Sequence, residues 1–229
     1  MSAIALVLLG VIGTVWVSKD YDDWRAFGTG GIPPNKKGYI KMRKVWLKRL
    51  LQHDDLRDAS LLPTDGPRYL NGPLPHRRGG RPQMMERVLP HRQKPEGIDP
   101  EARERLHSLV GKLLLDHPKI LKLGPSKTEG GVGDAIYAKD DVPTLNHAGA
   151  AVDYEIAHAH SADNSLHMFL SPLDARAVIE SEWGERSPVK ELGPPGWVMV
   201  YAPRDNAEVD VVESIMKAAV EWVTGAILL

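Results

Sequence analysis

Three histidines lie close together in this sequence, on either side of a predicted turn. His158 and His160 are two residues apart, so a β-strand would send both side chains to the same face. Residues 162–165 read Ala-Asp-Asn-Ser, and Asp and Asn favour turns because they tolerate the left-handed region and bond their own backbone. If two strands pair around this turn, His160 lies opposite His167, and three imidazoles share one face of a sheet.

The chemistry of such a triplet is limited by what imidazole does well. Imidazole is the side chain best suited to proton transfer near neutral pH, and it is also the commonest metal ligand. The triplet therefore predicts either an acid–base site or a three-histidine metal site with an open coordination position. A structural explanation also exists, because single buried histidines often only bond to backbone, but three on one face favour a function.

The residues around the histidines predict the elements that must hold them. Runs of β-branched and aromatic residues bounded by turn signals indicate strands. We expect these strands over residues 120–123, 133–138, 152–160, 166–170 and 196–202.

Helices are predicted from apolar residues at helical spacing and from their end signals. We expect them over residues 100–116, with Asp99 as N-cap, over residues 172–183, and over residues 206–224, where Gly225 ends the last one. The order helix, four strands, helix, strand, helix predicts an α+β fold. It should have a mostly antiparallel sheet with helices packed on one face.

Composition excludes several kinds of site. The chain has 229 residues, of which 42% are hydrophobic, so one domain with a real core is expected. It has no cysteine, which excludes disulfides, thiolate nucleophiles and cysteine-based zinc sites. Residues 1–117 carry 20 Lys and Arg against 13 Asp and Glu, whereas residues 118–229 carry 9 against 17. The basic half favours an acidic membrane surface as partner, and its lack of a nucleic-acid motif argues against nucleic acid.

The N-terminus strengthens the membrane interpretation. Residues 1–18 carry no charge and approach the length of a membrane-spanning helix. They lack the basic start and small-residue cleavage site of a signal peptide, so we expect an uncleaved anchor rather than a signal peptide or a buried core helix. Basic residues follow the segment and none precedes it, which predicts a single-pass protein whose body faces the cytosol, on an endomembrane.

The segment between the anchor and the folded domain has two parts. Residues 39–51 form a basic amphipathic helix that lies either on the bilayer or on the core. Residues 52–99 are rich in Pro, Gly and Arg, which predicts a linker or a loop wrapped around the body. We therefore divide the chain into an anchor (1–18), this basic wrapping segment (19–99) and an α+β domain (100–229).

Several motifs, taken in order, resemble the fungal luciferase family, whose members oxidise a 3-hydroxyhispidin-type pyrone and which includes many non-luminous relatives. They are Glu155-Ile156-Ala157-His158-x-His160, Leu166-His167, Trp183-Gly184-x-Arg186-x-Pro188 and Tyr201-Ala202-Pro203-Arg204, together with weaker upstream motifs. The resemblance covers nearly the whole chain, most densely from 153 to 224. In one departure, the family pattern commonly reads Arg-His-Pro-Leu where this chain has Arg186-Ser187-Pro188-Val189.

The resemblance implies an oxidoreductase that works without flavin, haem or nicotinamide and takes O2 as co-substrate. The enolate of the substrate would react with O2, form a cyclic peroxide, lose CO2 and give a ring-opened keto acid, with or without light. Such chemistry needs a base matched to an enol, a cation or donor to hold the enolate, and a dry pocket. The resemblance also lowers the expectation of a metal, which stays a minority possibility.

The resemblance and the residue types together give a list of candidate site residues. We expect His158, His160 or His167 to be the base and Arg186 to hold the anion. By strand parity Glu155 lies on the face opposite His158, which makes it a weaker candidate for orienting that imidazole. The expected substrate-binding residues are Glu155, Trp183, Tyr201, Arg204, Lys127 and Glu129.

Two of these candidates have competing explanations. Arg204 precedes a helix rich in acidic residues, so a salt bridge to Glu208 or Asp205 is favoured over anion binding. Trp183 is explained as well by core packing as by a pocket wall. For the whole protein, the alternatives to a pyrone oxygenase are a non-luminous small-molecule or lipid-binding domain and a metal-dependent enzyme on the three-histidine face.

Overall fold

The fold is described by a computed structural model that covers residues 2–188 and 193–228. Val189, the last residue of the motif that differs from the family pattern, lies outside these described residues.

An antiparallel sheet forms the centre of the described chain. Its strands are β1 (Leu121–Pro125), β2 (Asp134–Ala138), β3 (Glu155–Ala159), β4 (Leu166–Phe169), β5 (Gly184–Arg186) and β6 (Trp197–Val200). They lie in the order β1-β2-β3-β4-β6-β5, and every neighbouring pair is antiparallel. Five of these strands coincide with the predicted ones. The sequence does not predict β5, because three residues are too few to show an alternating pattern.

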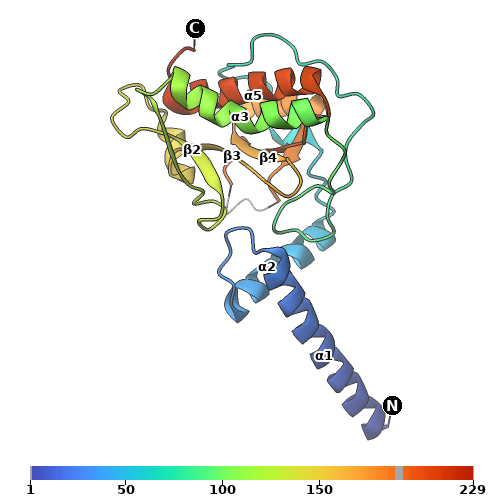
Figure 1. Cartoon of the computed structure of the whole chain (residues 1–229). Helices are drawn as coiled ribbons and strands as arrows, with labels where there is room; N and C mark the ends of the chain where they lie inside the picture. The colour runs from blue at the N-terminus through green and yellow to red at the C-terminus, as the bar shows by residue number, and fades with distance from the viewer. Residues whose placement is uncertain (1, 189–192, 229) are drawn as a thin grey trace.

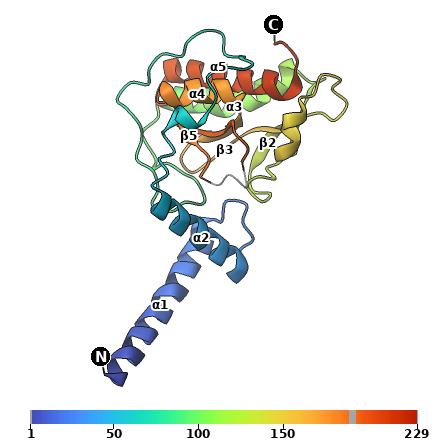
Figure 2. The same ribbon diagram turned by 180° about the vertical axis from the view of Figure 1, so that it is seen from behind.

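Helices cover one face of the sheet, as predicted for an α+β fold. α3 (Pro100–Asp116), α4 (Pro172–Glu180) and α5 (Asn206–Thr224) lie together on the side of the sheet away from the N-terminus (Figures 1 and 2). Asp205 is the N-cap of α5, and its side chain accepts a hydrogen bond from the Glu208 amide. Gly225 is the C-cap, and its φ of 66° is in the left-handed region. Asp99 precedes α3 as predicted, but its side chain makes no capping hydrogen bond.

The N-terminal helices lie on the other side of the molecule. α1 (Ala3–Phe27) projects away from the body, and α2 (Lys36–Gln52) crosses its inner end (Figure 1). Among the described residues α1 is the one helix long and apolar enough to cross a membrane, by length and composition. It continues beyond the predicted anchor because its last turns are held to the body: Trp24 is fully buried in a small second core with Met42 and Val88.

The Pro-, Gly- and Arg-rich segment wraps around the body. Pro75 accepts a hydrogen bond from the Trp183 indole, and Arg81 donates to the Ile179 and Gly184 carbonyl oxygens. The short 3₁₀ helix η1 (Ala59–Leu61) packs near α4, and a second, η2 (His147–Val152), precedes β3. We call residues 77–96 the strap, because they return across the sheet face that the helices leave open.

One irregularity decides which side chains share a face. Tyr137 pairs with Glu155, but its neighbour Ile136 pairs with Ala157, so Ile156 is an extra residue in β3. Such a β-bulge breaks strict alternation. The prediction that Glu155 lies on the face opposite His158 is therefore wrong.

The register of the histidine hairpin also differs from the prediction. His158 pairs with His167, and Ala159 pairs with Leu166, so His160 is not the partner of His167. The loop between the paired residues is two residues longer than predicted, and both extra residues lie on the β3 side. His160 lies just beyond the strand, where its amide donates to the Ser165 carbonyl oxygen.

A buried histidine–carboxylate cluster

A row of cross-strand neighbours builds the sheet face that carries the histidines. Ala135 pairs with His158, His158 with His167, His167 with Met199, and Met199 with Glu185. Directly paired residues in antiparallel strands point to the same face. One row across five strands thus brings two histidines together and places a carboxylate farther along the same face.

The three predicted histidines meet at one point. His167 Nδ1 lies 3.2 Å from His158 Nε2 and 3.1 Å from His160 Nε2. All three side chains are buried. The His167 ring stacks on the Trp197 indole with an angle of 9° between the planes. The structure therefore brings the three predicted histidines together, although the pairing of β3 with β4 differs from the predicted pairing.

The outward nitrogens of two of the imidazoles are held by hydrogen bonds. His158 Nδ1 lies 2.7 Å from Glu155 Oε1, and His160 Nδ1 lies 2.8 Å from Ser165 Oγ. Ser165 Oγ donates in turn to Asp163 Oδ1 at 2.9 Å, so it accepts from His160. Protons on the two Nδ1 atoms fit these acceptors, and both Nε2 atoms then face the centre of the cluster.

Glu155 organises the loop beside the cluster. Its carboxylate accepts hydrogen bonds from a ring of donors: Ser126 Oγ, the Lys127 and Thr128 amides, Thr128 Oγ1 and Tyr137 Oη. Burial raises the pKa of Glu155, but the hydrogen bond and charge of His158 and the bonds from Thr128 and Tyr137 outweigh it and lower the pKa to about 2. An ionised carboxylate therefore fixes both His158 and the loop.

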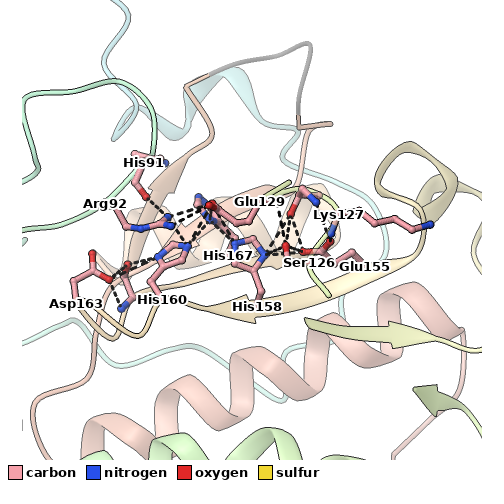
Figure 3. A network of polar contacts seen from close by, with 12 residues as sticks. His91, Arg92, Ser126, Lys127, Glu129, Glu155, His158, His160, Asp163 and His167 are labelled. Carbon is pink, nitrogen blue, oxygen red and sulfur yellow. Dashed lines mark hydrogen bonds and ion pairs between the residues drawn. The ribbon is translucent and has the colours of Figure 1, made fainter. Parts of the chain in front are cut away.

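That loop returns Glu129 to the centre of the cluster. Glu129 Oε1 lies 3.5 Å from His158 Nε2, 3.7 Å from His160 Nε2 and 3.9 Å from His167 Nδ1. Figure 3 shows this carboxylate facing the three imidazoles. Burial raises the pKa of Glu129, but hydrogen bonds and charge from His158 and Arg92 outweigh it and lower the pKa.

Arg92 reaches the cluster from the strap. Its Nη2 lies 3.0 Å from Glu129 Oε2, and its Nη1 lies 2.7 Å from His160 Nε2 (Figure 3). The positive charge of Arg92 adds to burial in lowering the pKa of His160 well below its ordinary value, and burial with the neighbouring histidines does the same for His167. Burial also lowers the pKa of His158, but Glu129 and Glu155 outweigh it and raise the pKa.

A second buried group adjoins the cluster. His91 Nε2 lies 2.5 Å from Glu185 Oε1, and Tyr201 Oη donates to Glu185 Oε2 at 3.1 Å. Burial raises the pKa of Glu185, but the hydrogen bond and charge of His91 outweigh it and lower the pKa. His91 Nδ1 is buried and has no hydrogen-bond partner among the described residues. The ring centroids of His91 and His167 are 5.6 Å apart, so the two groups touch.

Two cavities meet at His91. The inner cavity, of about 30 Å³, is lined by His91, Glu129, His158, His167 and Trp197. Ser187, which stands where the family pattern commonly has a histidine, also lines it. The outer cleft, of about 820 Å³, is lined among others by Arg49, Arg81, His91, Glu185 and Tyr201. Pockets for drug-sized ligands occupy roughly 300–1,000 Å³. The inner cavity therefore has room for a water or an ion, and the outer cleft for an organic ring compound.

Arg186, predicted to hold an anion, lies elsewhere. Its guanidinium donates to Asp54 Oδ1 at 2.5 Å, the Asp55 carbonyl oxygen at 2.7 Å and the Asp58 carbonyl oxygen at 2.9 Å. These bonds attach β5 to the chain that follows α2.

The remaining predicted residues divide between the site and other places. Trp183 is buried in the core on the helix side. Arg204 forms a salt bridge with Glu208, which is the alternative that the sequence favoured. The Lys127 ammonium lies 3.6 Å from Asp153, and its side chain is 61% exposed and extends away from the histidines (Figure 3). Only its amide takes part in the cluster.

Sequence reasoning missed the residues that reach the site from other segments. His91 and Arg92 belong to the strap, Ser126 to the loop after β1, and Glu185 to the short strand β5. Each lies far from the hairpin in sequence, and only Ser126 is a fixed position of an upstream motif in the family resemblance, Ser126-Lys127-x-Glu129. Asp163 could have been found, because it lies in the same turn as the histidines.

Comparison with known proteins relates nearly the whole chain to luciferases of fungi. A profile of the Luciferase domain matches residues 153–219. The luciferase of Neonothopanus nambi is 30% identical over 233 residues, which cover 96% of this chain and 85% of that protein. The luciferase of Armillaria gallica is 30% identical over 234 residues, with 96% and 86% coverage. No solved structure matches this chain.

Proposed function

Because this chain belongs to the fungal luciferase family, we propose that it is an oxidoreductase that uses O2 to oxidise a hydroxylated pyrone of the 3-hydroxyhispidin type. The relationship supports a luciferase-like activity in general, and the substrate and reaction are the proposed part. The proposal includes no flavin, haem or nicotinamide.

The observation that carries the proposal is a pair of unpartnered polar atoms beside one cleft. His91 Nδ1 and Arg49 Nε are both buried without a hydrogen-bond partner among the described residues, and both residues line the outer cleft. An unsatisfied buried polar group costs about 1–3 kcal/mol, so such atoms are expected where a ligand supplies the partner. One is an acceptor and the other a donor, which matches a hydroxyl group and an enolate oxygen.

These residues give a consistent division of roles. Glu185 accepts the His91 Nε2 proton, which leaves the Nδ1 lone pair to take a proton from the substrate hydroxyl. Glu185 also stabilises the imidazolium that results. Arg49 faces the enolate, and Tyr201 completes the wall of the cleft. The predicted histidines at 158, 160 and 167 form the inner end of the site, directly behind His91.

The proposed reaction needs no external reductant. The enolate carbon forms a bond to O2, the second oxygen closes a cyclic peroxide on the lactone carbonyl, and the O–O bond breaks as CO2 leaves. Both atoms of O2 enter the products, and the pyrone supplies the electrons.

The test is O2 uptake and light emission after 3-hydroxyhispidin is added to the purified full-length protein. We expect O2 uptake with release of CO2. The variant His91→Gln should lower the rate about 10²–10⁴-fold, the usual contribution of a general base. Arg49→Gln should mainly raise KM. His147→Ala is the matched control, because His147 is an exposed histidine on η2.

Two outcomes would contradict the proposal. One is a folded wild-type protein that gives neither O2 uptake nor light, which favours a small-molecule or lipid-binding domain. The other is full activity in His91→Gln. Light together with O2 uptake identifies a luciferase, whereas O2 uptake without light identifies a dark oxygenase of the same family.

We also propose that α1 anchors the protein to an endomembrane with the body in the cytosol. The support is the exposed apolar surface of α1 together with the basic residues that follow it. Carbonate extraction should leave the full chain in the membrane fraction, and protease added to intact microsomes should digest the body. Release by carbonate, or protection of the body, would overturn this assignment.

A further inference from the structure

We propose that Glu129, His158, His160 and His167 bind one divalent first-row transition-metal ion. These four residues offer ligand atoms that all lie within 4.8 Å of one another, and the three histidines are buried. The ion itself does not depend on the proposed function. Its use in holding the substrate does, because that role rests on oxidation of an enol in the adjoining cleft.

The donor atoms already have the spacing of a coordination sphere. A tetrahedral ion with ligand distances of about 2.0–2.2 Å holds neighbouring donor atoms about 3.3–3.6 Å apart. Here His167 Nδ1 lies 3.1 and 3.2 Å from the Nε2 atoms of the other two histidines, and the distances from the three histidines to Glu129 Oε1 are 3.5, 3.7 and 3.9 Å. Small adjustments would therefore suffice to place an ion among them.

The residues behind the ligands are those that metal sites require. Ligating histidines usually donate their other ring N–H to a carboxylate or a polar neighbour, which fixes the tautomer. Glu155 plays this part for His158, and Ser165 with Asp163 plays it for His160. A histidine with a purely structural role needs only one hydrogen-bonded ring nitrogen. Such a role does not explain why one nitrogen from each of three histidines faces the same point.

The cluster also contains the negative charge that an ion would neutralise. Arg92 now supplies the positive charge beside Glu129, and its guanidinium contacts His160 Nε2. A metal ion would take that nitrogen and displace the guanidinium. Arg92 therefore competes with the ion for His160 and Glu129. Removal of Arg92 should strengthen metal binding rather than weaken it.

The donor set selects the class of ion. Three imidazole nitrogens and one carboxylate oxygen suit the ions from manganese to zinc, whereas magnesium and calcium prefer oxygen ligands throughout. The inner cavity of about 30 Å³ borders the ligands, so a water or a substrate oxygen bound there would be a fifth ligand beside the four residues. With the proposed reaction, that position faces the enolate from the side of His91.

The first test is cobalt binding to the full-length protein, purified with a tag that contains no histidine and treated with a chelator. Cobalt(II) gives a visible absorption spectrum that reports its coordination. We expect one Co²⁺ per chain with the spectrum of nitrogen ligation, and Zn²⁺ should displace it. Metal analysis of the protein before chelation should find a near-stoichiometric transition metal.

Variants separate a metal site from a merely polar core. Glu129→Gln keeps the shape and removes the charged ligand, and His160→Ala removes a nitrogen ligand that lies just beyond the end of β3, so both should weaken Co²⁺ binding at least tenfold. Glu155→Gln acts through His158 and should weaken it about 10–100-fold. Arg92→Met should strengthen it, and His147→Ala should leave it unchanged. Circular dichroism shows whether each variant is folded.

The failure of this inference is distinguishable from the failure of the proposed function. Absence of stoichiometric Co²⁺ and Zn²⁺ binding in the folded wild-type protein overturns the inference, even if 3-hydroxyhispidin drives O2 uptake. Binding that Glu129→Gln and His160→Ala leave unchanged overturns it as well. Binding that both Glu129→Gln and His160→Ala weaken supports it, even if no O2 uptake occurs and the proposed function fails.

Discussion

The two faces of the sheet are built from the same strands but by different means. On one face, Leu166, Met168 and Val200 point into an apolar core that α3, α4 and α5 cover. On the other face, the row through His158 and His167 meets polar groups from the strap and from the loop after β1. The helix face is closed by regular elements, and the histidine face is closed by irregular chain.

This difference separates stability from function. Burial of apolar side chains stabilises the helix face, and these side chains need only the shape and volume that fill the core. On the histidine face each buried polar group needs a particular partner at a particular distance, and the partners come from distant segments. We expect changes on the helix face to act on the free energy of unfolding, and changes on the histidine face to act mainly on chemistry.

The largest effect on stability is expected from Ile215→Ala in α5. Ile215 is fully buried against the sheet, and removing its side chain leaves a cavity in the core. The free energy of unfolding should fall by about 2–5 kcal/mol, and Ile215→Val should cost only about 0.5–1.5 kcal/mol. Denaturant unfolding measures both changes. Activity lost beyond the unfolded fraction would show that the two faces are not separate.

A somewhat smaller effect is expected from Arg77→Ala at the start of the strap. The Arg77 side chain is fully buried, bonds Glu96 Oε2 at 2.9 Å and lies over the Trp183 and Tyr201 rings. Its loss should cost about 2–3 kcal/mol, because Glu96 loses a charged partner and the strap is held less firmly. Hydrogen exchange should speed up in residues 77–96 more than in α5. Equal acceleration of exchange in both regions would show that Arg77 does not hold the strap in particular.

The acid sensitivity of the histidine face should depend on Glu185. Its pKa in the folded protein is lower than its ordinary value of 4.5, so the ionised carboxylate stabilises the fold above that pH. This stabilisation should disappear as the pH falls below 4.5 and through the lowered pKa. Glu185→Gln should therefore be less stable than the wild type at neutral pH, and the difference should shrink on acidification. Thermal unfolding between about pH 7 and pH 3 measures it. A constant difference would exclude this carboxylate as the cause.

The smallest effect is expected from Lys127→Ala. The Lys127 ammonium pairs with Asp153 at 3.6 Å, and both side chains are more than half exposed. Exposed pairs of this kind contribute about 0–1 kcal/mol, so the stability should change by less than about 0.5 kcal/mol. O2 uptake should be unchanged. A large loss of activity would mean that this side chain turns inward to meet the substrate.

The two faces also differ in how far the sequence predicts them. The apolar stripe of α5, ending at Gly225, and the short apolar runs of β4 and β6 predict the helix face, because apolar patterns in the sequence indicate burial. The histidines were found for the same reason. The bulge at Ile156 and the hairpin register were not, because both depend on pairing with β2 and β4 rather than on β3 alone.

The partners of the histidines were the hardest to predict. Glu129 was a candidate, but nothing in its neighbourhood indicates that the loop turns it back toward the cluster. His91 and Arg92 lie in a segment whose Pro and Gly content predicts only irregular chain. Such contacts are fixed by tertiary packing, so a single sequence carries no local signal for them.

The bulge in β3 makes the site depend on a residue count as well as on residue identities. Because Ile156 is the extra residue, deleting it would restore strict alternation and leave Glu155 and His158 two positions apart, on the same face of the sheet. If residues 155–158 instead all paired without a bulge, Glu155 would lie three positions from His158 in strict alternation, would turn toward the apolar core, and would no longer hold the imidazole. The contact between Glu155 and His158 thus fits a spacing of two positions without a bulge or of three positions with one, and relatives that keep the site should show one of these two combinations.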